Sequence, residues 1–292
     1  DSDEVDMSVN QAPEGEADNG RASAIIGLQA WREWLASPVG RYVLEWEQAC
    51  YDHAVADLFG YVALQLSLPE LDTLRNNRMP SRLYGLSRAD ASAGQGSVVS
   101  TSVLLEDNGE LPFRDQSLDL VTLPHVIEFS SDPHQLLREV DRVLRPEGRV
   151  VLTGFNPISL WGIRSAIPSG LLRPLLPRQS QMIALPRLRD WFKLLSFEFE
   201  RGRYGCYRPP CRSERWLERT RFMEAAGDRW WPICGAVYSI SAVKRVRAMR
   251  LVGPAWAKPA RAGARALPVA SPQFGPRETT PIPRRRPDDR PD

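Results

Sequence analysis

A histidine and a glutamate follow a short apolar stretch within LPFRDQSLDLVTLPHVIEF, residues 111–129. His125 stands directly after that stretch, where an imidazole can orient a substrate or take a proton from it. The same side chain can instead cap the next segment or lie satisfied in the core. Glu128 is more typical of a surface or capping carboxylate than of a catalyst. The pattern predicts a strand that presents polar groups to a ligand at its carboxyl end.

A second polar position, Asn156, ends another apolar strand and is followed by a proline. Substrates reach such strand ends in open α/β sheets, which makes Asn156 a candidate substrate-binding residue. An Asn-Pro pair is also a plain turn initiator, so both interpretations stay open.

No metal site is expected. The four cysteines contain no Cys-x-x-Cys pair, and the three histidines show no ligand spacing. We find no signal peptide and no apolar run of about 18 residues, which predicts a cytoplasmic protein without membrane contact and with reduced thiols.

The elements around these residues alternate between strand and helix. Residues 118–123 and 149–155 are predicted to be strands, and residues 132–148 between them a helix. Asp132 suits its N-cap, Pro133 its first position and Gly148 its end. Such a unit predicts two parallel strands with a right-handed crossover. Further strands are expected at 82–87, 97–105, 197–207 and 236–246, and a short helix at 186–197.

Composition divides the chain of 292 residues into four parts: an acidic tail (1–23), a helical cap (24–80), an α/β domain (81–249) and a basic tail rich in Pro, Ala and Arg (250–292). Residues 1–20 contain seven acidic residues and no basic one. From Lys244 to residue 292 the chain contains twelve Lys or Arg residues and four Asp or Glu residues. Both ends lack apolar periodicity, which predicts disorder. Residues 156–187 hold five prolines and are expected to form a flap over the sheet edge.

The order of these motifs resembles a known family. The sequence D-x-x-x-L-P-F at 107–113, the following strand with HVIEF, and the helix ending RVLRPEG are similar to the class I S-adenosylmethionine-dependent methyltransferases, specifically the methyltransferase type 11 domain. The resemblance covers residues 105–155 closely and extends more loosely to the terminal strand. NPISLWGIR, residues 156–164, resembles a narrower branch, the YafS group of bacterial proteins.

The resemblance implies an α/β, Rossmann-like sheet, mostly parallel with an antiparallel last strand, and S-adenosylmethionine as the cofactor. It implies that Asp107, with Asn108 beside it, accepts a hydrogen bond from the adenine amino group. Leu111 and Phe113 would line the adenine-binding loop, and His125 would face the cofactor or substrate. Asp107 also begins an ordinary Asp-Asn-Gly turn, so the turn interpretation stays open.

The chain departs from the family where the glycine-rich cofactor loop is expected. The strand at 83–87 offers one glycine, Gly85, and no acid in the usual place. The roughly twenty residues between Ser87 and Asp107 are too few for a helix, a strand and a second helix. The family's Leu-Glu-His triplet reads Ile127-Glu128-Phe129. We therefore expect a rebuilt cofactor half.

The resulting hypothesis is a methyltransferase that uses S-adenosylmethionine on an unknown acceptor. The alternative is a non-catalytic relative of the same fold that acts as a binding or scaffold module. The arginine-rich tail permits a weaker third interpretation, contact with nucleic acid. Neither the methyl acceptor nor the oligomeric state follows from the sequence.

Overall fold

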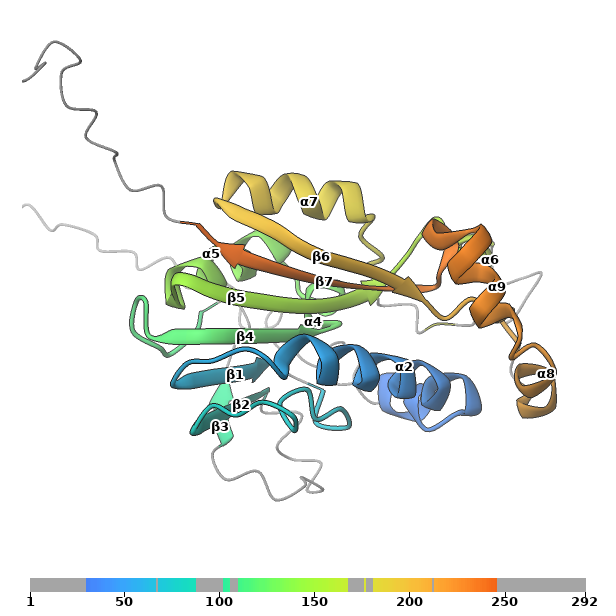
Figure 1. The fold of residues 1–292 in the computed structure, drawn as a ribbon, viewed down its shortest axis with the longest axis horizontal. Coiled ribbons are helices and arrows are strands. Elements are labelled where there is room, and N and C mark those ends of the chain that lie inside the picture. Colours follow the sequence, from blue (N-terminus) through green and yellow to red (C-terminus); the bar gives the residue numbers. More distant parts are fainter. Residues whose placement is uncertain are drawn as a thin grey trace, which may run out of the picture. The chain divides into compact units, whose positions relative to one another are not determined.

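The computed structural model describes residues 30–66, 68–87, 102–105, 110–167, 176, 181–211 and 213–245. All of them belong to the first of two compact units, Asp1–Arg247; the second unit, Ala248–Asp292, lies outside the described residues, as do both predicted tails. Seven strands form one sheet (Figure 1). They are β1 (Val62–Leu66), β2 (Ser81–Ser87), β3 (Ser102–Leu105), β4 (Leu118–Pro124), β5 (Leu144–Phe155), β6 (Phe197–Gly205) and β7 (Val237–Lys244).

The described helices are mostly short. They are α2 (Pro38–Val55), α4 (Val126–Phe129), α5 (Pro133–Val143), α6 (Leu160–Ala166), α7 (Leu185–Leu194), α8 (Glu214–Arg219), α9 (Met223–Trp230) and the 3-10 turn η1 (Pro232–Cys234). None of the described helices is long and apolar enough to cross a membrane.

The strand order is β3-β2-β1-β4-β5-β7-β6, with β7 antiparallel to both of its neighbours and the other described pairs parallel. This confirms the predicted fold class, including the antiparallel last strand and the parallel pair formed by β4 and β5. Because the parallel strands share one direction, their carboxyl ends meet at a single edge of the sheet.

Successive strand residues face opposite sides of the sheet, and each side is covered by helices. Ala63, Leu120 and Val151 join one core cluster with α2, whereas Leu64, Val121 and Val150 join the other with α5 and α7. The strands are therefore buried on both faces, which explains their nearly continuous apolar sequences.

Helix α5, between β4 and β5, begins as predicted. Asp132 caps α5 by accepting hydrogen bonds from the backbone N–H groups of His134 and Gln135, and Pro133 occupies its first turn. Its predicted end at Gly148 is wrong, because the helix stops at Val143 and Leu144 already pairs with Leu118 as part of β5. Gly148 lies in this early part of the strand instead.

The predicted cap over 24–80 needs a correction as well. Residues 38–55 are helical, but Val62–Leu66 is a strand at the centre of the sheet, paired with β2 and β4. Consequently the strand at 81–87 is the second strand and not the first. A five-residue, mostly apolar segment that begins shortly after a helix cannot be distinguished from helix by periodicity alone.

Candidate functional site

The carboxyl edge of the sheet gathers the polar residues that the sequence singles out. His125 follows β4, Asn156 follows β5, and α6, α8, α9 and η1 surround the end of β6 on the same side. The arrangement confirms that these elements converge, and the contacts of each side chain decide what it can do.

His125 is held between two carboxylates and is 1% exposed. Its Nδ1 lies 2.8 Å from Glu128 Oε2, and its Nε2 lies 2.6 Å from Glu47 Oε1 on α2. The contact with Glu47 is an ion pair by distance, but its alignment is too poor for a directed hydrogen bond. A left-handed backbone at His125, with φ of 55°, turns the ring into this position.

The two carboxylates determine the charge of the ring. Burial by itself lowers the pKa of His125, but the negative charges of Glu47 and Glu128 more than offset this and raise the pKa to about 10. Burial also raises the pKa of Glu128, against the opposing effect of His125 and the Phe155 N–H that donates to it. A protonated imidazole has no free lone pair at neutral pH. The geometry therefore argues against the predicted role of His125 as a base or as a group in contact with substrate.

Aromatic side chains close this polar cluster off from water. The ring of Phe155 lies 4.5 Å from that of His125, and Trp31 approaches it edge-on at 5.2 Å. Trp31 Nε1 and both carboxylate oxygens of Glu47 are buried without a hydrogen-bond partner among the described residues. The cluster is thus a buried group of charges beneath α2. No local pattern indicates the roles of Glu47 and Trp31, because both lie about 80 residues or more from His125 along the chain.

Asn156 is also buried, at 2% exposure, and its side chain is fully used. Its amide donates to the carbonyls of Ile233 at 2.8 Å and Gly235 at 2.9 Å, and its carbonyl oxygen accepts from the Ile158 N–H. In this arrangement Asn156 fastens η1 to the end of β5 and leaves no group for the substrate contact that the sequence predicts.

The Leu-Pro-Phe turn before β4 is clamped from α5. Arg142 donates to the carbonyls of Leu111 and Phe113, each at 2.9 Å, while Glu139 accepts from the Leu111 N–H at 3.1 Å. Leu111 is buried and Phe113 is half-buried. The turn is therefore held firmly against the last turns of α5, in the segment that leads into β4. Asp107 and Asn108, which precede it, lie outside the described residues.

The chain after β1 has no glycine between residues 68 and 80. Gln65 instead fixes this segment, donating to the carbonyls of Leu68 and Leu71 and accepting from the N–H and hydroxyl of Thr73. Leu68 adopts a left-handed backbone with φ of 55°, a conformation that is costly for a side chain other than glycine.

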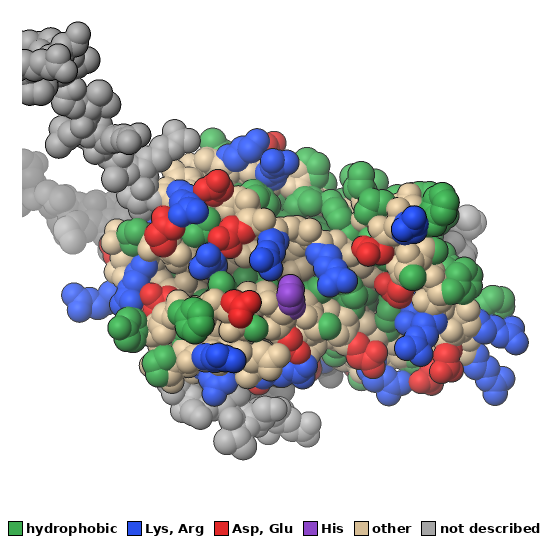
Figure 2. Space-filling model, in the orientation of Figure 1, with side chains coloured by type: hydrophobic (Ala, Val, Ile, Leu, Met, Phe, Trp, Pro, Cys, Tyr) green, Lys and Arg blue, Asp and Glu red, His purple; other side chains and the backbone are tan. Residues whose placement is uncertain are grey.

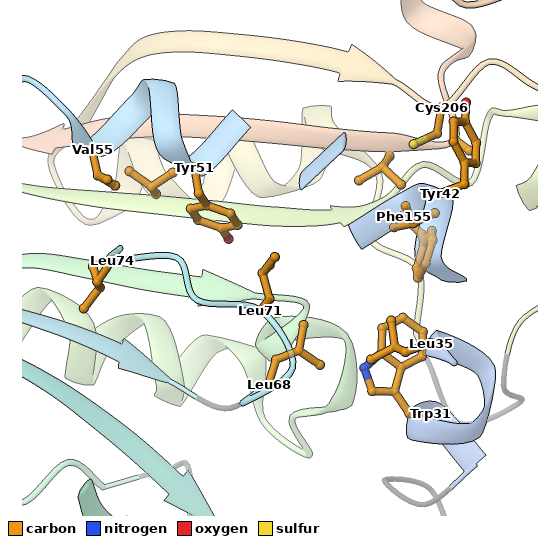
Figure 3. Close-up of a cluster of buried hydrophobic side chains, with 14 of the residues drawn as sticks. Trp31, Leu35, Tyr42, Tyr51, Val55, Leu68, Leu71, Leu74, Phe155 and Cys206 are labelled. Carbon is orange, nitrogen blue, oxygen red and sulfur yellow. The ribbon is translucent and has the colours of Figure 1, made fainter. Parts of the chain in front are cut away.

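Three leucines of this segment fill the space under α2. Leu68, Leu71 and Leu74 belong to the core cluster that contains Tyr51 and Phe155 (Figure 3). Gly85, the predicted loop glycine, lies within β2, paired with Leu66 and Val103. Gly85 thus lies in a paired strand, as expected, and its assignment to cofactor binding stays a prediction.

A groove of about 420 Å³ opens between α2, the end of β6 and α9. Tyr42 forms part of its wall, with the Arg208 guanidinium 4.3 Å from the centre of the Tyr42 ring. The indole ring of Trp46 packs against Gly205, and a Cβ atom on residue 205 would lie 2.0 Å from that ring. The groove adjoins the candidate edge and was not predicted from the sequence.

No group of three or more His, Cys, Asp or Glu side chains that could hold a metal ion occurs among the residues that the structure describes.

Comparison with known proteins agrees with the resemblance that the sequence indicates. Residues 75–152 match the family model described as a methyltransferase domain. The chain is 49% identical over 88 residues to the uncharacterized protein YafS of Escherichia coli K12 and 30% identical over 93 residues to a demethylmenaquinone methyltransferase of Streptomyces griseus. These segments cover 30% and 29% of this chain but 36% and 40% of the relatives, so the chain spans well under half of each relative's length.

Two solved structures share the fold. One is a methyltransferase of Haloferax volcanii bound to the Trm112 activator, with a TM-score of 0.51 and 16% identity over 75% of this chain and 98% of that chain. The other is an S-adenosylmethionine-dependent methyltransferase of Thermotoga maritima, with a TM-score of 0.51 and 14% identity over 76% and 98% of the two chains. The fold is thus that of the class I methyltransferases, as predicted.

Proposed function

We propose that this protein transfers a methyl group from S-adenosylmethionine to an acceptor whose class is still open. The observation that carries the proposal is the sheet order β3-β2-β1-β4-β5-β7-β6 with an antiparallel β7, combined with the methyltransferase-domain match over residues 75–152. In such sheets a ligand binds outside the carboxyl ends of the parallel strands. A cytoplasmic location is proposed with it, from the sequence alone.

The adenine end of the cofactor has a suitable surface in the described residues. Phe113 is half-buried and offers apolar area, the buried Leu111 supports it from below, and Arg142 keeps their turn in place. Asp107, four residues before Leu111, remains the proposed acceptor for the adenine amino group. The bound cofactor supplies an activated methyl group, so the chain's own residues need only hold it, align the acceptor and exclude water.

The methionine end fits less well. The segment after β1 presents Leu68, Leu71 and Leu74 where a glycine-rich loop would expose backbone N–H groups, and Gln65 of β1 holds this segment by accepting from the Thr73 N–H. These residues do not form the usual cradle for the cofactor's charged end. We therefore derive no role for them in the transfer itself.

This misfit favours the second candidate function, a non-catalytic module with the methyltransferase fold. The buried ion cluster around His125 points the same way, because it supplies no base at the strand edge. The two functions differ in one measurable property, binding of the cofactor.

Calorimetry with S-adenosylmethionine and S-adenosylhomocysteine tests the proposal. We expect saturable but modest binding of both, and Asp107→Ala should weaken it by about 1–3 kcal/mol, the scale for a lost charge-assisted hydrogen bond. The matched control is Asp190→Ala, at an exposed position of α7, which should bind like the wild type.

Two outcomes would change the conclusion. Wild-type protein that gives no heat, no thermal shift and no crosslinking with either cofactor form rejects the enzyme and leaves the binding module. Binding that is equally tight in Asp107→Ala retains the enzyme but removes Asp107 from its site.

A further inference from the structure

The segment between α9 and β7 exposes large apolar side chains in an unbroken run. Residues 228–234, with the sequence DRWWPIC, are all exposed. Trp230 is 70% exposed, Trp231 60% and Ile233 60%. Single exposed apolar residues are ordinary, but a contiguous group of this size marks a surface that contacts something apolar.

The backbone beneath these side chains is held firmly. The buried hydroxyl of Tyr207 donates to the Pro232 carbonyl at 2.8 Å, and Asn156 donates to the carbonyls of Ile233 and Gly235. The structure thus anchors the main chain of η1 while directing the neighbouring indole rings outward. An ordered platform of this kind presents apolar groups with little entropic cost on binding.

The exposed apolar area continues onto α6. Asn156, which binds η1, is followed closely by Ile158, Leu160 and Ile163, which are 56%, 55% and 58% exposed. Figure 2 shows hydrophobic side chains gathered where Figure 1 draws α6 and α9. We name this surface the tryptophan face, defined by Ile158, Leu160, Ile163, Trp230, Trp231 and Ile233.

Positive charge lies in the segment that leads directly into the tryptophan face. Four exposed arginines of the α8–α9 segment have no carboxylate partner among the described residues: Arg215, Arg219, Arg221 and Arg229. Of the four acids in the same segment, Glu214 faces Arg41 at 3.9 Å and Glu224 faces Arg208 at 3.8 Å. Two carboxylates of the segment, Glu218 and Asp228, make no ion pair with a described residue, so the four arginines give the segment that leads into Trp230 a net positive charge.

We infer that the tryptophan face binds the surface of an anionic lipid bilayer. Tryptophan favours the boundary between headgroups and acyl chains, and adjacent arginines attract anionic headgroups. The aliphatic members of the face argue against single-stranded nucleic acid, which needs stacking surfaces that isoleucine and leucine lack. Surface binding requires no membrane-spanning helix. It also stands apart from methyl transfer, because it follows from exposure and charge alone.

The inference can be tested with the full chain and vesicles of phosphatidylcholine and phosphatidylglycerol in equal parts. We expect co-sedimentation and quenching of tryptophan fluorescence by brominated acyl chains. The double variant Trp230→Ala/Trp231→Ala should lose about tenfold or more of the affinity and most of the quenching. Quenching is essential, since the basic stretch after Lys244 could attract anionic vesicles without any insertion.

The matched control is Phe59→Ala/Tyr61→Ala. These side chains are 76% and 71% exposed and directly precede β1, at the amino edge of the sheet. Their removal deletes similar apolar area and should leave vesicle binding within about twofold of the wild type. Circular dichroism and the thermal midpoint check that each variant is folded.

A second variant keeps the test decisive if the tryptophan variant fails to fold. Arg221→Glu/Arg229→Glu should weaken binding to the mixed vesicles much more than binding to phosphatidylcholine alone. Equal binding of the folded tryptophan variant and the wild type, or sedimentation without quenching, overturns the inference. Single-stranded RNA or a second copy of the chain that protects the two tryptophans, without vesicle binding, overturns it as well.

Discussion

His125 illustrates how a residue chosen for its chemistry can have a structural role. The imidazole, Glu47 and Glu128 form a buried ionic cluster, in which α2 supplies Glu47 and α4 with its N-cap supplies the other two, and aromatic rings exclude water from it. A buried charge that loses its partner is strongly destabilising, whereas the complete cluster need not add much stability. The position of His125 after a strand was predictable. Its partner Glu47 was not, because sequence alone does not identify contacts between distant segments.

The cluster predicts a pH dependence of folding stability. The folded-state pKa of His125 is raised to about 10, above the ordinary 6.5, so the histidine's contribution is fully present below about pH 6.5 and declines as pH rises toward 10. Between pH 6.5 and 8.5 the free energy of unfolding should fall by at most about 1.4 kcal/mol per pH unit. Urea unfolding of the wild type measures this slope.

Variants at two histidines separate this effect from other titrations. His125→Gln should unfold more readily at neutral pH and lose the slope, whereas the exposed His53→Gln should keep it. Should His125→Gln not fold, ring resonances of the wild type give the answer by NMR. A His125 ring that titrates between pH 6 and 8 contradicts the prediction.

At the scale of elements, the segments with strong local signals were predicted well. Asp132 and Pro133 marked the start of α5, and the apolar run of β5 marked a strand buried on both faces. The segment 62–66 was missed because its short apolar run continues the helical pattern before it. The helices α8 and α9 were also missed, since most of their side chains are exposed and give no clear apolar stripe.

The contact between α5 and the turn before β4 supports a prediction at this scale. Arg142→Ala removes the donors to the Leu111 and Phe113 carbonyls and leaves Glu139 without its cation. We expect a loss of about 1–3 kcal/mol in the free energy of unfolding and faster amide exchange in residues 110–117. Urea unfolding and hydrogen exchange measure the two effects.

Arg138→Ala provides the control, because Arg138 is exposed on the same helix and makes no ion pair among the described residues. Its stability should lie within about 0.5 kcal/mol of the wild type. Similar losses in the two variants would show that the arginine clamp does not hold the turn.

For the whole molecule, the position of β1 changes where the domain begins. Strand β1 lies between β2 and β4, and α2 covers one face of the sheet. The predicted boundary at residue 81 therefore separates the central strand from its neighbours. Composition could mark the acidic and basic ends, but only three-dimensional pairing shows that residues 30–80 belong to the sheet domain.

Two shortened chains test this organisation. Residues 21–254 retain all the described elements, and the removed ends lack the apolar periodicity needed to offset chain entropy. Their thermal midpoint should lie close to that of the full chain. Residues 81–249 lose β1 and α2, exposing edges of β2 and β4 together with the buried face beneath α2, and should not fold cooperatively. A sharp thermal transition for 81–249, or a much lower midpoint for 21–254, would contradict this view of the domain.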